Sequence, residues 1–195
     1  MIFNKNLSVK QILLYAFITI AASAINCAGS LFSGNISFPL YLDSIMTISI
    51  VAVLGLGPGI FCAALTNIAL QIFNNVNIFF MSCHLCTVFL SWLIFKAAKK
   101  ADSEKIHVNY FMYAGIASAI SNALLGSILS VILFGGNTPN PQVNNCVQGI
   151  YFVLQNIDLA TYIGGTLTNL VDKTISALLS YFVYCAAVKI FKNDF

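Results

Sequence analysis

The sequence from Tyr41 to Gln71 reads YLDSIMTISIVAVLGLGPGIFCAALTNIALQ, two apolar segments joined by a Gly-Pro-Gly break. The first segment, Asp43 to Leu56, opens with an Asp-Ser pair, and the Asp43 carboxylate can accept hydrogen bonds from the free amides of a first helical turn. The second segment, Pro58 to Phe73, opens with proline, which helices tolerate at their start. Each segment is about as long as the hydrocarbon core of a bilayer is thick when its ends are counted, so the pair predicts a transmembrane hairpin.

The hairpin contains a few polar residues that lie deep within it, namely Asp43, Thr47, Thr66, Asn67 and Gln71. Polar groups are costly in hydrocarbon, so we expect them to face other helices or a cavity. Asn67 and Gln71 are four residues apart, a spacing that places both on the same face of a helix.

The composition indicates an integral membrane protein. Of 195 residues, 59% are hydrophobic and only 8% are charged, and the mean hydropathy is +0.88. A soluble domain carries roughly a quarter of charged residues, so a soluble fold of this length could not bury so much apolar surface. The chain contains no arginine, the residue that proteins most often use to bind phosphate groups and nucleic-acid bases. Its absence argues against nucleic-acid binding.

Four further apolar runs complete the predicted set of six transmembrane helices, over Gln11–Ser30, Ile78–Phe95, Asn109–Phe134 and Gly164–Phe191. The first run resembles a secretory or lipoprotein signal, but it continues past the length of a signal core, so we interpret it as an uncleaved helix. Cys146–Thr161 is apolar but too short and interrupted to span, which leaves a re-entrant, interfacial or loop structure open.

The lysines predict the orientation of the six spans. Eight of the nine lysines lie in the N-terminal tail, in the loop from Lys96 to Lys105 and at the C-terminus. Six spans place these three regions on one side, and positively charged loops favour the cytoplasm. We therefore expect an all-α, polytopic membrane protein, a single domain over 1–195 with both termini cytoplasmic.

The sequence offers little catalytic chemistry. It contains no serine-hydrolase or zinc-protease motif and only two histidines, so we expect no enzyme, no metal and no cofactor. Cys83 and Cys86 have the spacing of thiol redox enzymes, but cysteine is also an ordinary small apolar residue in membrane spans. A structural role for the pair is favoured, and a membrane thiol oxidoreductase stays open.

Polar residues of four different spans fall at one depth, between the midplane and the outer surface. This pattern predicts a cavity open to the outside that holds a small polar ligand, although polar residues also join helices to one another. The expected substrate-binding residues, including two aromatic side chains for the walls, are Asn67, Gln71, His84, Asn122, Asn169, Asp172, Phe38 and Tyr41. Because Lys173 points about 100° away from Asp172 on a helix, we expect the Asp172 carboxylate to bond another helix's amide, a backbone amide or the ligand instead.

The six-span plan, the hairpin YLDSIMTISIVAVLGLGPGIFCAALTNI and the late segment NLVDKTISALLSYFV resemble the S components of energy-coupling factor (ECF) transporters. The resemblance implies a substrate-capture subunit in a prokaryotic cell membrane that binds a vitamin or trace nutrient. It also implies docking, through small residues of the first span, onto a membrane T component driven by two cytoplasmic ATPases. Ala24 and Ala28 match the Ala-x3-Ala docking motif of the family.

Aromatic walls with few charges favour a flat, mostly uncharged heterocycle, such as riboflavin or thiamine, over a di-acid. A second class of function stays open beside the redox enzyme. A membrane sensor module could use the same hairpin to bind a signal, although such modules are usually fused to a soluble output domain.

Overall fold

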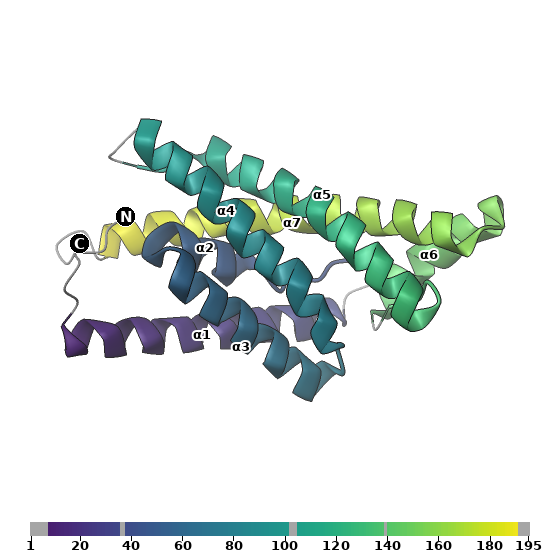
Figure 1. Ribbon diagram of the computed structural model, residues 1–195, viewed down its shortest axis with the longest axis horizontal. Helices are drawn as coiled ribbons and strands as arrows, with labels where there is room; N and C mark the ends of the chain where they lie inside the picture. Colours follow the sequence, from purple (N-terminus) through teal and green to yellow (C-terminus); the bar gives the residue numbers. More distant parts are fainter. Residues whose placement is uncertain (1–7, 36–37, 102–104, 139, 191–195) are drawn as a thin grey trace.

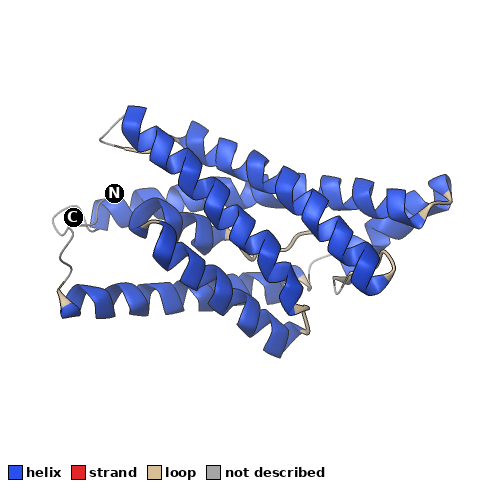
Figure 2. Ribbon diagram, viewed as in Figure 1, coloured by secondary structure: helices blue, strands red, loops and turns tan. Residues whose placement is uncertain are grey.

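The computed structural model describes residues 8–35, 38–101, 105–138 and 140–190, and its regular structure there is helical throughout (Figure 2). The helices in chain order are α1 (Val9–Ser33), α2 (Ile45–Leu54), α3 (Leu56–Asn74), the short 3-10 helix η1 (Ile78–Phe80), α4 (Met81–Ala101), α5 (Val108–Phe134), α6 (Pro141–Leu154) and α7 (Ile157–Ile190). The all-α class predicted from the sequence is confirmed.

Among the described residues, five helices are long and apolar enough to cross a membrane: α1, α3, η1 with α4, α5 and α7. The distribution of polar and apolar residues on α1 supports a membrane location for this helix. Its buried face consists of small and polar residues such as Thr19, Ser23 and Asn26, while large apolar side chains such as Phe17 and Ile20 are exposed. A helix with polar residues inside and apolar residues outside suits lipid rather than water as its surroundings.

The first half of the predicted hairpin contains a shorter helix than expected. The segment Asp43–Leu56 contains only the ten-residue helix α2, which is about 15 Å long and cannot cross a membrane alone. Asp43 does not cap this helix, because its carboxylate pairs with Lys173 of α7 instead. Only Gly55, whose φ is +94°, separates α2 from α3, so the turn is even tighter than predicted.

The last predicted span also begins earlier than expected. α7 starts at Ile157 rather than near Gly164, and the ambiguous Cys146–Thr161 region divides between α6 and the first turn of α7. Gln155, with a φ of +53°, ends α6, and the Asn156 side chain accepts a hydrogen bond from the first turn of α7. The predicted end at Phe191 lies outside the described residues.

The helices α1 to α5 alternate in direction, and α6 continues in the general direction of α5 before α7 runs back, as Figure 1 shows. The start of α1, the α2–α3 turn, the end of α4 and the end of α7 lie together on the left of the view, and α6 lies at the other end. The described lysines other than Lys173 lie on those left-hand segments or on the loop at Lys105. Lys5 and Lys192, which the orientation argument also used, are outside the described residues.

The apolar core lies toward the lysine end of the bundle. Phe111 of α5 is fully buried and packs against Phe95 of α4 and Tyr184 of α7, with ring centroids 4.6 and 5.4 Å away. α5 and α7 approach closely because Gly115 lies against α7, where a Cβ atom would come within 2.8 Å of the Lys173 carbonyl oxygen. Large apolar and aromatic side chains thus fill the lysine end of the bundle, and the buried polar side chains lie toward the other end.

Candidate ligand-binding cavity

A cavity of about 130 Å³, with Lys173 in its wall, lies toward the end of the bundle opposite the other described lysines. It is bounded by the end of α1, by η1, by helices α3 to α7 and by the loop between α1 and α2. Apolar walls come from Leu70, Phe80, Val143 and Val147, and many of the remaining lining residues are polar. The polar lining includes Tyr41, Asp43, Asn67, Asn74, His84, Asn122, Ser127, Ser130, Thr138, Asn140, Thr161, Asn169 and Lys173.

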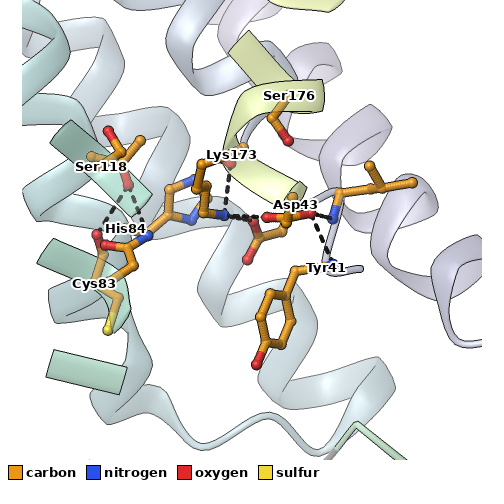
Figure 3. A network of polar contacts seen from close by, with 12 residues as sticks. Tyr41, Asp43, Cys83, His84, Ser118, Lys173 and Ser176 are labelled. Carbon is orange, nitrogen blue, oxygen red and sulfur yellow. Dashed lines mark hydrogen bonds and ion pairs between the residues drawn. The ribbon is translucent and has the colours of Figure 1, made fainter. Parts of the chain in front are cut away.

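One side of the cavity holds a buried ion network. The Lys173 ammonium of α7 lies 2.9 Å from Asp43 Oδ1, 2.8 Å from Asp172 Oδ2 and 3.0 Å from Ser44 Oγ. Figure 3 shows Lys173 and Asp43 pointing toward one another beside the ring of Tyr41, whose centroid is 5.9 Å from the lysine nitrogen. Two carboxylates share one ammonium, so the network carries a formal net charge of −1.

Asp172 joins α7 to the loop before α2. Its Oδ1 accepts hydrogen bonds from the backbone N–H groups of Tyr41 and Leu42, at 2.9 and 2.8 Å. This agrees with the expectation that Asp172 bonds a backbone amide. Asp172 also forms an ion pair with Lys173 through Oδ2, so only the exclusion of Lys173 as a partner is wrong. The lysine stem is long enough to bring its nitrogen back to the neighbouring carboxylate.

His84 connects the cavity to the interior of the α1–α3 side. Asn67 Nδ2, which can only donate, lies 2.8 Å from His84 Nδ1, so Nε2 carries the ring proton and donates it to Thr47 Oγ1 at 3.0 Å. Thr47 also accepts a hydrogen bond from Asn26 Nδ2 at 2.8 Å. Amide, imidazole and hydroxyl groups of four helices thus form one continuous buried chain.

The structure brings five of the eight predicted substrate-binding residues to the cavity wall: Tyr41, Asn67, His84, Asn122 and Asn169. The other three do not line it. Gln71 is exposed near the end of α3, the Phe38 side chain is about half exposed, and Asp172 is fully buried on the far side of the ion network. Whether the five lining residues bind a ligand stays a prediction.

Several lining groups were absent from the predicted set. Asp43 and Lys173 are charges inside apolar runs, and that signal could have selected them. Val143 and Val147 are apolar residues four apart in the ambiguous region, a spacing typical of a packed helix face. Asn140 belongs to an uncharged turn-rich loop, and its side chain donates to the Leu40 carbonyl 100 residues earlier in the chain, a contact without a local signal.

The cysteine pair and the predicted docking alanines lie on different helices and in different surroundings. Cys83 is buried and lines the cavity, whereas Cys86, one turn later on α4, is half-buried and does not line it. The predicted docking residues Ala24 and Ala28 are exposed on α1, on the side away from α2 and α3, and Ala21 is exposed beside them.

The fold and the cavity define the class of this chain as an all-helical, multi-pass membrane protein. Comparisons with protein-family models, with curated proteins and with solved structures found no match.

Proposed function

We propose that this chain is the substrate-capture subunit of an ECF-type importer, which binds a small heterocyclic vitamin or related nutrient in the cavity described above. The observation that carries the proposal is the cavity itself. Amide side chains of α3, α5 and α7 and the imidazole of α4 line one cavity beside a charged network. A small number of placed polar groups within apolar walls is typical of ligand pockets in proteins.

The proposed topology has six membrane crossings with both termini in the cytoplasm. The five long helices supply five crossings, and the loop from residue 38 to 44 together with α2 supplies the sixth. The proposal is supported by the lysines at one end of the bundle, since positively charged loops favour the cytoplasm. In this orientation the cavity lies toward the outside, where a nutrient would arrive.

The proposed partners are a membrane T component and two cytoplasmic ATPases. The sequence has no nucleotide-binding motif, so ATP-driven transport would take its ATPases from partner subunits. Ala24 and Ala28 support α1 as the docking helix, because small exposed residues let the backbone of a second helix approach closely.

Binding of the compound that co-purifies with the chain tests the pocket. We expect Asn122→Ala and Asp172→Asn each to weaken this binding at least tenfold, which is about 1.4 kcal/mol. Asn122 lines the cavity, while Asp172 holds the backbone of Tyr41 at its edge. Gln71→Ala, at an exposed position outside the lining, is the matched control. Parental affinity in both cavity variants, measured by isothermal titration, would show that these residues only join helices.

Transport itself is tested in proteoliposomes that contain the chain, the T component and the ATPases. ATP-dependent accumulation of the compound is the expected result, and accumulation without the ATPases would contradict the proposal.

A further inference from the structure

The direction of two amide groups in the cavity wall is fixed by their neighbours. Asn67 Nδ2 lies 2.8 Å from the Ala63 carbonyl oxygen, and Asn169 Nδ2 lies 2.9 Å from the Gly165 carbonyl oxygen. Carbonyl oxygens only accept hydrogen bonds, so each amide must point its nitrogen toward its own helix. The Oδ1 atoms therefore point the other way.

These two amide oxygens are open acceptors. Neither Oδ1 atom has a hydrogen-bond partner within the described part of the chain, and neither is among the unpartnered polar atoms that are sealed from solvent. Both residues line the cavity, so their oxygens face space that a ligand can occupy. A ligand with N–H donors would satisfy them, whereas a ligand with only acceptors would leave them without a partner.

The lysine and imidazole donors of the wall are already occupied, whereas the Tyr41 hydroxyl and the Asn74 amide have no hydrogen-bond partner within the described residues. Three oxygens lie within 3.0 Å of the Lys173 nitrogen, and both ring nitrogens of His84 bond protein groups. An anionic ligand would have to compete with two carboxylates for the single ammonium. The formal charge of −1 on the network repels an anion and attracts a cation.

The volume of the cavity suits a ligand portion of about one ring. An apolar protein cavity of roughly 150 Å³ holds one benzene molecule, and the cavity here measures about 130 Å³. Phe80 offers an aromatic ring in the wall, and its ring stacks on that of Phe134 at an interplanar angle of 6°. A flat ring fits such a wall better than a branched chain.

We propose that the cavity selects a single-ring nitrogen heterocycle that carries N–H donors and is neutral or cationic, and that it rejects carboxylates and phosphates. This inference rests on the proposed function, because it takes the cavity as the capture site. It narrows the expected ligand from heterocycles in general to one-ring amines.

Three compounds of nearly equal shape test the inference on the purified full chain in detergent micelles. 4-Aminopyridine is a cationic donor, 4-methylpyridine replaces the amino group by a methyl group, and isonicotinate replaces it by a carboxylate. We expect ligand-observed NMR titration to give an affinity for 4-aminopyridine at least tenfold above that for either other compound. A matching or higher affinity for 4-methylpyridine or isonicotinate would overturn the inference, as would no binding of any of the three.

Variants of Asn169 connect the preference to the cavity. Asn169→Leu removes one of the two open acceptors and should reduce the preference over 4-methylpyridine, while Asn169→Asp keeps an acceptor, adds negative charge and should retain or increase the preference over both other compounds. Gln71→Leu, outside the lining, should leave the preference unchanged. An unchanged preference over 4-methylpyridine in Asn169→Leu would overturn the inference.

The outcome is separable from that of the proposed function. If the co-purified compound is transported with the help of the ATPases but the three probes rank differently, only the inference fails. If 4-aminopyridine binds as expected but no partner-dependent transport occurs, only the proposed function fails.

Discussion

Replacing Lys173 by methionine removes the one positive charge of the buried ion network while keeping a long side chain. Lys173 is 3% exposed and lies within 2.9 Å of two carboxylate oxygens, so the variant leaves Asp43 and Asp172 without a counter-ion. Removing one partner of a buried ion pair typically destabilises a protein by about 3–5 kcal/mol. For a chain of this length each kcal/mol lowers Tm by about 2–4 °C, so we expect a fall of about 6–20 °C.

Thermal unfolding followed by circular dichroism in detergent micelles measures this effect. Lys100→Met, at an exposed lysine of α4, is the matched control and should change Tm by about 1 °C or less. The double variant Lys173→Met with Asp43→Asn should recover part of the lost stability, because it removes one of the two unpaired carboxylates. A Tm for Lys173→Met equal to that of the control would refute the reasoning that the network holds the loop before α2 onto α7.

Three further outcomes are expected. Gly115→Ala should destabilise the chain by about 1–3 kcal/mol in chemical unfolding, since the new Cβ would lie 2.7 Å from a side-chain atom of α7. Gly126→Ala is the control and should leave the stability unchanged, because its Cβ would lie 3.8 Å from the nearest atom. Ala24→Trp should reduce co-purification of the T component severalfold yet leave ligand affinity unchanged, and the reverse pattern would place α1 in the pocket. Replacing Cys83 and Cys86 together by serine should leave ligand uptake largely intact, and complete loss of uptake with normal expression would favour a thiol redox enzyme.

Hydropathy was sufficient to predict most of the fold. The expected span Asn109–Phe134 differs from α5 by one residue, because a long uninterrupted apolar run has no competing conformation in lipid. The segment before Gly55 was predicted as a full span because it is equally apolar. Its first residues instead form a loop that α7 holds through Asp172 and Lys173, and such contacts between residues about 130 apart have no local signal.

The depth of the cavity in the membrane could be predicted from the sequence, but the exact set of residues that line it could not. Polar residues at one level on several spans indicated where Asn67, His84 and Asn169 would meet, because lipid excludes such groups. Gln71 lies four residues after Asn67, yet it is exposed, whereas Leu70 and Asn74 on either side of it line the cavity. Helical periodicity gives the approximate face of a helix, but the neighbouring helices decide which residues at the edge of that face are covered.

The most direct test of the central claim is mass spectrometry of the small molecules that co-purify with the chain. The parental protein should carry a bound compound in near-stoichiometric amount. A variant with Gly126→Leu, which directs a side chain from α5 into the cavity, should purify without it. The same compound at the same amount in both proteins, or no enriched compound in the parental protein, would contradict capture of a small ligand in this cavity.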